Sequence, residues 1–152
     1  MPRLSVLIQR DDDAADLPLP SYATPGSAGM DLYAAVTQDV TIEPGRRALI
    51  STGIRLAIPE GYEAQVRPRS GWAARNGIGM VNSPGTIDSD YRGTVSVILI
   101  NWGDVPVVVK RRDRIAQLVV TPVVQVDWHE ATEDYLPATS RHEGGFGHTG
   151  FA

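Results

Sequence analysis

The sequence predicts a single all-β domain built as a sandwich, a jelly roll or a barrel. Fifteen glycines and eleven prolines separate many short runs of β-branched residues, and no long stretch has helical periodicity. A chain of 152 residues is also large enough to bury one core of its own. The expected strands are Leu4–Gln9, Met30–Ala34, Val40–Ile42, Arg47–Ile50, Ile54–Ala57, Tyr62–Val66, Ile78–Met80, Val95–Ile100, Val107–Val109, Ile115–Val120 and Val123–Trp128.

Composition restricts the possible classes of function. A net charge of −4 disfavours an extended contact with a phosphate backbone, so we expect no nucleic-acid partner, although a small nucleotide site needs only a few local cations. Cysteine is absent, which excludes disulfides, thiol catalysis and thiolate metal sites. The apolar run Leu4–Ile8 is too short for a signal peptide or a membrane span, so we expect a cytoplasmic protein that does not enter a membrane.

The second expected strand contains a charged residue. Asp31 interrupts the apolar segment SAGMDLYAA, residues 27–35. A carboxylate in such a strand needs hydrogen bonds, a cation or solvent, because burying it alone is costly. It either pairs with backbone amides at the strand end or serves a polar site.

The segment Pro68–Gly77, PRSGWAARNG, predicts the one short helix. Ser70 is a good N-cap, residues 71–76 can form the helix, and Gly77 suits the position after its end. A helix start presents free N–H groups, and Arg69 beside it adds a charged fork, so the segment is suited to phosphate oxygens. The alternative is an ordinary capped helix with a solvent-facing arginine.

A polar loop, Val81–Gly93 (VNSPGTIDSDYRG), follows the helix and connects two expected strands. Loops held by strands are a common setting for functional residues. Asp88 and Asp90 are two residues apart, so they point to one side if the loop is extended and diverge if it turns. The alternative is an acidic turn whose side chains bond nearby backbone N–H groups.

The C-terminal third contains two further polar features. Arg114 and Gln117 belong to KRRDRIAQLVV, residues 110–120, where they could reach a shared polar pocket, although such basic clusters are usually solvated turns. The tail ATSRHEGGFGHTGFA, residues 138–152, is too rich in glycine to form a packed element. Its isolated Phe146 and the preceding Arg141 suggest a lid that orders over a base and a phosphate.

Five segments can now be compared together with known families. They are AGMDLYA (Ala28–Ala34), PRSG (Pro68–Gly71), GTIDSDYRG (Gly85–Gly93), RDRIAQLV (Arg112–Val119) and RHEGGFGHTG (Arg141–Gly150). In this order and with compatible spacing they resemble the five motifs of the trimeric dUTP pyrophosphatases (dUTPases) of bacterial type. One motif alone is weak, but five in order across essentially the whole chain are very specific.

The resemblance implies a fold, an assembly and a reaction. Residues 1–137 would form a jelly-roll-like (β-clip) domain, and residues 138–152 a flexible arm that closes over the active site. Three subunits would form a homotrimer with shared active sites. The reaction would be hydrolysis of dUTP to dUMP and diphosphate with Mg2+ bound through the triphosphate. It would keep uracil out of DNA and supply dUMP for thymidylate synthesis.

The central loop matches the nucleoside-binding part of the family. Asp88 matches the carboxylate that activates the attacking water and also meets the sugar 3′-OH. Tyr91 matches the ring packed against the deoxyribose, which leaves no room for a 2′-OH. The uracil pocket matches Asn82 and the backbone of Gly85, Thr86 and Ile87.

The remaining motifs match the phosphate-binding part and the arm. Gln117 matches a phosphate-contacting side chain, and Asp31 matches an aspartate that acts on Mg2+ through water only. From the arm, Phe146 would stack on the uracil and Arg141 would lie near the γ-phosphate. The phosphate-binding loop matches Arg69, Ser70 and Gly71.

Two positions depart from the common pattern of the family. His148 stands where many relatives have serine, although some bacterial members have histidine there, and its role is open. Ser96 stands where relatives often have a longer lysine or methionine beside the nucleotide, so we expect any contact to be weak or through its backbone.

Two other functions are alternatives. A dCTP deaminase of the same superfamily needs a glutamate in the pocket, and GTIDSDYRG contains none. A non-catalytic dUTP-binding regulator would bind without turnover, and such a protein needs neither a lid nor the water-activating carboxylate of Asp88.

Overall fold

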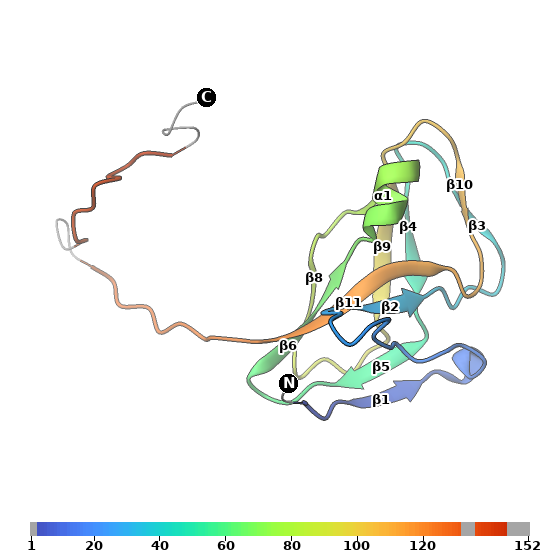
Figure 1. Cartoon of the computed structure of the whole chain (residues 1–152), viewed down its shortest axis with the longest axis horizontal. Helices are drawn as coiled ribbons and strands as arrows, with labels where there is room; N and C mark the ends of the chain where they lie inside the picture. Colours follow the sequence, from blue (N-terminus) through green and yellow to red (C-terminus); the bar gives the residue numbers. More distant parts are fainter. Residues whose placement is uncertain (1–2, 132–135, 146–152) are drawn as a thin grey trace.

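The computed structural model describes residues 3–131 and 136–145, which consist mainly of short strands and loops (Figure 1). In chain order the elements are β1 (Leu7–Arg10), a 3-10 turn (Asp12–Ala14), β2 (Met30–Tyr33), β3 (Val40–Ile42), β4 (Arg47–Ser51), β5 (Ile54–Ala57), β6 (Tyr62–Arg67), α1 (Ser70–Asn76), β7 (Ile78–Met80), β8 (Gly85–Ile87), β9 (Ser96–Asn101), β10 (Val107–Val109) and β11 (Arg114–Pro122). The all-β class with one short helix is therefore confirmed.

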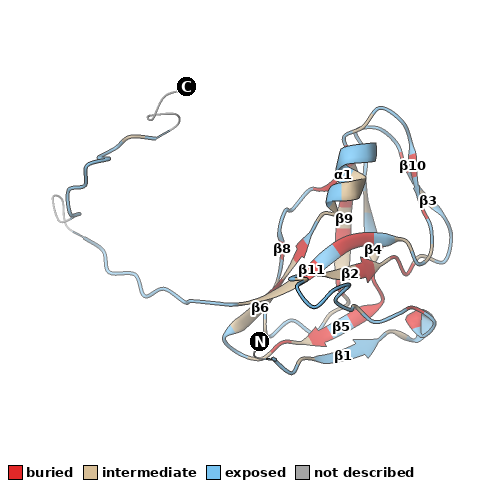
Figure 2. Cartoon of the chain, in the orientation of Figure 1, coloured by how far each residue is buried: buried red, intermediate tan, exposed pale blue. Residues whose placement is uncertain are grey.

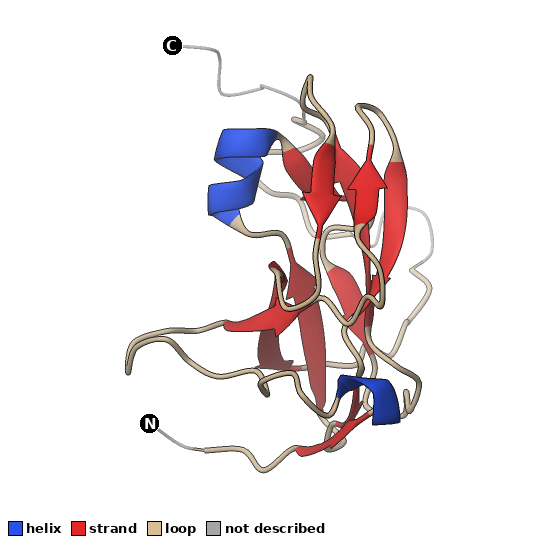
Figure 3. Ribbon diagram, turned by 90° about the vertical axis from the view of Figure 1, so that its right-hand side faces the viewer, coloured by secondary structure: helices blue, strands red, loops and turns tan. Residues whose placement is uncertain are grey.

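The strands form antiparallel sheets that bring distant segments together. The largest sheet has the order β2-β11-β6-β8, and a second has the order β4-β9-β7. Two further pairs, β1 with β5 and β10 with β3, complete the described strands. Figure 3 shows α1 on the flank of this body of strands. In the described part of the chain, no helix has the length and apolar character that crossing a bilayer requires.

A single main core lies between the sheets. Along β9, Val97 and Leu99 are buried, while Ile98 between them is only half-buried, as the two-residue period of a strand requires. The same cluster includes Leu32 of β2 and Ile115 of β11, so both larger sheets contribute to it. Figure 2 shows buried residues along β5, β9 and β11 and exposed ones on the outer loops.

Asn101, at the end of β9, is a fully buried polar residue with well-placed partners. Its Nδ2 donates to the carbonyl oxygens of Ile42 and Val105, each at 2.8 Å. Its Oδ1 accepts from the N–H of Gly103 at 2.9 Å. One amide thus joins β3, β9 and the connection to β10.

We expect Asn101→Leu to lower the free energy of unfolding by about 2–4 kcal/mol, because it leaves three backbone groups without their partner. Urea unfolding followed by circular dichroism measures this change. Gln9→Leu, which replaces an exposed amide on β1, is the control and should change stability by less than about 0.5 kcal/mol. Equal stability of the Asn101→Leu and unmodified proteins would show that the hydrogen bonds of this amide do not stabilise the fold.

The predicted strand Val123–Trp128 is wrong. The N–H of Val123 donates to the carbonyl of Gly61 at 2.9 Å, and beyond it the extended chain leaves the body (Figure 1). β-branched residues favour extended backbone, but a strand also needs a neighbouring edge. Val124, Val126 and Trp128 are 89%, 66% and 88% exposed.

Other differences from the predicted elements are smaller. The first strand begins at Leu7 and not at Leu4. The short β8 and the 3-10 turn were not predicted. Because β8 is defined by its pairing with β6, which precedes it by about twenty residues, its three residues alone gave no strand signal.

Asp11 connects the end of β1 to the start of β9. Its Oδ1 accepts from Nε of Arg55 at 2.7 Å, and its Oδ2 accepts from Oγ1 of Thr94 at 2.6 Å. The hydrogen bond from Thr94, followed by that from Arg55, lowers the pKa of the Asp11 carboxyl below its ordinary value. This carboxylate therefore stabilises the fold at pH values above its ordinary pKa, and the contribution is lost as the pH falls through the lowered pKa.

Candidate functional site

A basic cluster forms around Asp31 of β2. Its Oδ1 accepts from Nε of Arg69 at 3.0 Å, and its Oδ2 lies 3.3 Å from Nη1 of Arg114. Nη1 of Arg69 also donates to the backbone carbonyl of Arg114 at 3.3 Å. Asp31 thus pairs with two guanidinium groups and not with backbone amides. Two cations against one carboxylate leave this cluster with a net positive charge that suits phosphate oxygens.

Strand register places Gln117 in the same cluster. On β11 it lies directly opposite Asp31 of β2 and directly opposite Arg67 of β6. Residues directly opposite one another on adjacent strands point to the same face of the sheet. Gln117 and Arg67 therefore lie on the same face of the sheet as Asp31, the carboxylate that Arg114 contacts. A pocket shared by Arg114 and Gln117 stays a prediction.

The start of α1 adds backbone donors beside this cluster. The helix begins at Ser70, with Arg69 and not Ser70 at the N-cap position and no side-chain capping bond. The carbonyl of Arg69 accepts from the N–H groups of Trp72 and Ala73, so among the described residues the N–H groups of Ser70 and Gly71 have no backbone partner. The predicted helix end is confirmed, because Gly77 has φ 66° and donates to the last turn.

The loop after β7 contains the second group of candidates. β7 pairs with β9, so the loop is held by two neighbouring strands, as predicted. Within it, β8 crosses to the edge of the larger sheet and pairs Gly85 with Val66 and Thr86 with Gln65. The side-chain amide of Asn82 lies against Gly85, where a Cβ atom would be 3.1 Å from Nδ2. Asn82 and the β8 backbone are therefore adjacent.

Asp88 begins a tight turn that leads into the following residues. The N–H of Tyr91 donates to the carbonyl of Asp88 at 3.2 Å, so the chain turns here and Asp88 and Asp90 diverge. Asp88 is exposed, and no side-chain hydrogen bond to another described residue engages it. The structure therefore does not show the alternative, in which the carboxylate of Asp88 would accept hydrogen bonds from nearby backbone N–H groups. Asp88 remains available to an external group.

Asp31 and the loop strand β8 lie at opposite edges of one sheet. Asp31 is on β2 and the loop strand is β8, which are separated by three strand spacings, or roughly 14 Å. Asp31 and Ile87 are also offset along the strand direction. Asp31 is in register with Arg67 of β6, whereas Ile87 is in register with Ala64 of β6, and three residues along a strand correspond to roughly 10 Å. Ile87, the neighbour of Asp88, therefore lies roughly 17 Å from Asp31 along the sheet.

Other candidates lie outside both groups. Ser96 is half-buried on β9 opposite Ser51, in the other sheet. Arg141 is exposed, and its Nε donates to the carbonyl of Gly144 at 2.8 Å, a contact within the C-terminal segment. Phe146 and His148 lie outside the described residues, so their predicted roles stay predictions.

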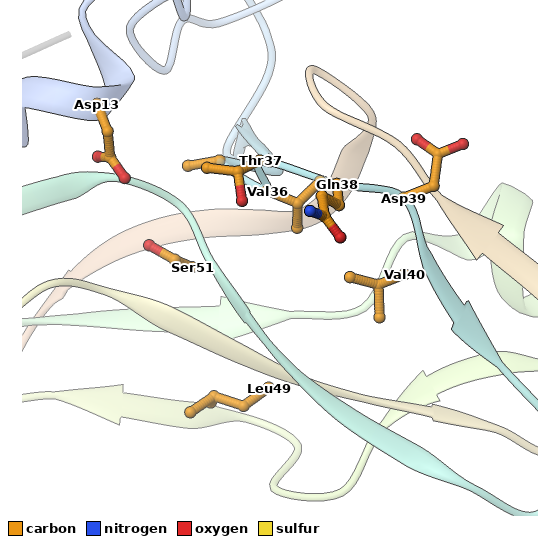
Figure 4. Close-up of a pocket in the computed structure, with 9 residues that line it drawn as sticks. Asp13, Val36, Thr37, Gln38, Asp39, Val40, Leu49 and Ser51 are labelled. Carbon is orange, nitrogen blue, oxygen red and sulfur yellow. The ribbon is translucent and has the colours of Figure 1, made fainter.

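A surface hollow of about 430 Å³ is separate from these groups (Figure 4). It lies between the 3-10 turn, β4 and the connection from β2 to β3, and none of the candidate residues lines it. Its lining is Asp13, Ala35, Val36, Thr37, Gln38, Asp39, Val40, Leu49 and Ser51.

The chemistry of the basic cluster limits how Mg2+ could bind there. Within residues 3–131 and 136–145, no three His, Asp or Glu side chains gather in a way that could hold a metal ion directly. Both oxygens of Asp31 face guanidinium groups. Asp31 therefore fits Mg2+ through intervening water, with phosphate oxygens of a ligand as the direct ligands.

The fold and these two groups define an all-β protein with a positively charged cluster beside a helix start and an exposed polar loop. A family profile described as dUTPase matches residues 15–150. A deoxyuridine 5'-triphosphate nucleotidohydrolase of Wolbachia pipientis subsp. Culex pipiens (strain wPip) is 55% identical over 148 residues, which cover 97% of each chain. One from Caldanaerobacter subterraneus subsp. tengcongensis is 54% identical over 143 residues, 94% of this chain and 95% of that relative. The chain belongs to the dUTPase family.

Solved structures agree with this family at the level of the fold. The dUTPase of Staphylococcus bacteriophage 80alpha with dUPNHPP has a TM-score of 0.84 at 22% identity, covering 97% of this chain and 99% of the phage chain. A variant dUTPase of phage phi11 of S. aureus, described with a structural Mg(II) ion, has a TM-score of 0.75 at 21% identity, covering 88% of this chain and 100% of that chain. The predicted jelly-roll-like fold is confirmed.

Proposed function

We propose that this protein hydrolyses dUTP to dUMP and diphosphate. The observation that carries the proposal is the basic cluster of Arg69, Arg114 and Gln117 around Asp31, in a member of the dUTPase family whose overall charge is negative. Such a cluster is suited to a compact triphosphate. The product would supply thymidylate synthesis, and removal of dUTP would keep uracil out of DNA.

In the proposed reaction, water attacks the α-phosphorus and the bond to the bridging oxygen breaks, so that diphosphate leaves. Asp88 orients the water and accepts its proton, a role supported by its exposure and by the absence of a side-chain partner among the described residues. Arg69, Gln117 and the N–H groups of Ser70 and Gly71 hold the phosphates. Bound Mg2+ would neutralise charge on the triphosphate oxygens.

The central loop would select the base and the sugar. The amide of Asn82 and the backbone of Gly85, Thr86 and Ile87 offer hydrogen-bonding groups to the uracil edge. A pocket formed from backbone can exclude the methyl group of thymine, and unmatched polar groups disfavour cytosine. The ring of Tyr91 would pack against the deoxyribose and exclude a 2′-OH.

Active sites shared between the subunits of a homotrimer are part of this proposal. A base at Asp88 must lie within a few ångströms of the water at the α-phosphorus. Within one chain, however, Asp31, the carboxylate at the centre of the cluster, lies roughly 17 Å along the sheet from Ile87, the neighbour of Asp88. A loop from one subunit facing the cluster of another resolves this separation. The exposed extended segment 123–131 offers an apolar surface for such an assembly.

The C-terminal arm and the cellular location complete the proposal. Residues 138–152 would close over the nucleotide, with Phe146 stacked on the uracil and Arg141 near the γ-phosphate. Ser96 would contribute weakly, through its backbone. The cytoplasm is the compartment that we predict for this activity.

The decisive experiment measures diphosphate release with Mg2+ from dUTP, dTTP, dCTP and UTP in parallel. We expect rapid release from dUTP and at least about 10²-fold lower kcat/KM for the other three nucleotides. Formation of a uracil nucleotide from dCTP would indicate the deaminase alternative. Binding of dUTP without diphosphate release would indicate a non-catalytic regulator and would contradict the proposed function.

A further inference from the structure

The Tyr91 side chain is held by the two residues that follow its turn. Its Oη donates to the backbone carbonyl of Thr94 at 3.1 Å. The phenol also lies across Gly93, where a Cβ atom would be only 2.3 Å from Oη. Tyr91 is 44% exposed, so part of its surface is open to a ligand. The hydrogen bond to Thr94 and the packing on Gly93 therefore both hold the ring.

Thr94 is in turn held by a residue far away in the sequence. Its Oγ1 donates to Oδ2 of Asp11 at 2.6 Å, across 83 positions of the chain. The other carboxylate oxygen of Asp11 accepts from Nε of Arg55 at 2.7 Å, and the N–H of Asp11 donates to the carbonyl of Gly53 at 2.8 Å. Asp11 is thus fixed on both sides and offers Thr94 a rigid acceptor.

The backbone of Val95, the residue after Thr94, is also held by hydrogen bonds. The N–H of Val95 donates to the carbonyl of Ile54 at 2.8 Å, and its carbonyl accepts from the N–H and Oγ1 of Thr52 at 3.0 Å and 2.6 Å. Thr94 therefore lies between a fixed Val95 and the turn that contains Tyr91. Its carbonyl shares a planar peptide with the Val95 N–H and is held with it. Its hydroxyl bond to Asp11 holds the other side of Thr94, where the chain leads back to Tyr91.

We propose that Asp11 is a positioning residue that acts through Thr94 to hold the ring of Tyr91 in the orientation that excludes a ribose 2′-OH. This inference rests on the proposed function, in which Tyr91 packs against the deoxyribose. Asp11 touches no part of the nucleotide. It affects the discrimination between dUTP and UTP by anchoring Thr94, the end of the short segment that carries Tyr91 and the residue to which the tyrosine Oη is bonded.

The test compares kcat/KM for dUTP and UTP in Asp11→Ala, Thr94→Val and the double variant. We expect each single variant to lower the dUTP to UTP ratio by about five- to twentyfold, because a charge-assisted hydrogen bond that anchors the end of the Tyr91 segment is lost. The loss should arise from a higher KM for dUTP and a lower KM for UTP more than from kcat. The double variant should lose no more than either single variant, since both remove one contact.

Two further variants separate positioning from a general loss of stability. Asp16→Ala removes a carboxylate that pairs with Arg111 and has no hydrogen bond to Thr94 or Tyr91, and it should leave the ratio unchanged. Asp11→Asn keeps an oxygen that can accept from Thr94 and should restore part of the ratio lost in Asp11→Ala. Thermal unfolding of every variant shows whether it is folded at the assay temperature. If Asp11→Ala is unfolded at that temperature, the dUTP to UTP ratio of Thr94→Val alone tests the inference.

The outcomes distinguish this inference from the proposed function. If the unmodified protein releases diphosphate from dUTP and not from UTP, but Asp11→Ala and Thr94→Val keep the full ratio, the positioning role is wrong and the function stands. Additive losses in the double variant would also overturn the path through Thr94. If the unmodified protein does not hydrolyse dUTP, the proposed function fails, and this inference fails with it.

Discussion

Asp88→Asn is expected to lower kcat for dUTP by about 10²- to 10⁴-fold while nucleotide binding is retained. The substitution preserves the shape of an exposed side chain and removes the negative charge that would accept a proton from water. Diphosphate release gives kcat, and calorimetric titration with a non-hydrolysable dUTP analogue gives the affinity, which should change by less than about threefold.

Asp90→Asn is the matched control for this prediction. It removes an equal charge from the same exposed loop two residues away, within the turn that starts at Asp88, where the two carboxylates point apart. It should therefore retain most of the turnover. Full activity of Asp88→Asn would exclude Asp88 as the base, and equal losses in the two variants would show that loop charge, and not a placed base, matters.

Arg69→Ala is expected to raise KM for dUTP by about 10- to 100-fold, because one charged hydrogen-bonding group to the phosphates is lost. Asp31 would then keep only Arg114 as a cationic partner, which also reduces the net positive charge of the cluster. Steady-state kinetics over a range of dUTP concentrations measure the change. Arg46→Ala, in an exposed turn, is the control and should leave KM unchanged.

A mixture of the two impaired proteins provides a sharper version of these tests. Refolding Asp88→Asn together with Arg69→Ala allows mixed assemblies to form. In some pockets, the carboxylate would come from the Arg69→Ala chain and the arginine from the Asp88→Asn chain. Those pockets would be intact, so activity above the sum of the separate proteins is expected. No gain on mixing would contradict sites shared between chains.

The local part of the fold could be predicted from the sequence. Gly77 ends α1 in the left-handed conformation that glycine favours, and the strands of the core follow short β-branched runs. These signals depend on neighbours within a few residues. The same reasoning failed for Val123–Trp128, where the composition favours a strand but no adjacent strand lies in the described chain.

The candidate site required information that local sequence does not contain. A polar role for Asp31 could be predicted from its place in an apolar strand, but its partners Arg69 and Arg114 are 38 and 83 positions away. Arg67 joins the cluster only because β6 and β11 pair in one particular register. A shift by one residue would place it on the other face. The residues of the motifs were therefore identifiable, whereas their supporting contacts were not.

The separation of Asp31 from the Asp88 loop within one chain also makes the proposed activity subject to mass action. A pocket completed by two copies exists only in the assembled fraction, so specific activity per chain should decline when the protein is diluted below the dissociation constant of the assembly. The isolated chain could retain its buried core under those conditions and still be inactive. Cellular abundance would then regulate turnover more steeply than in proportion to the number of chains.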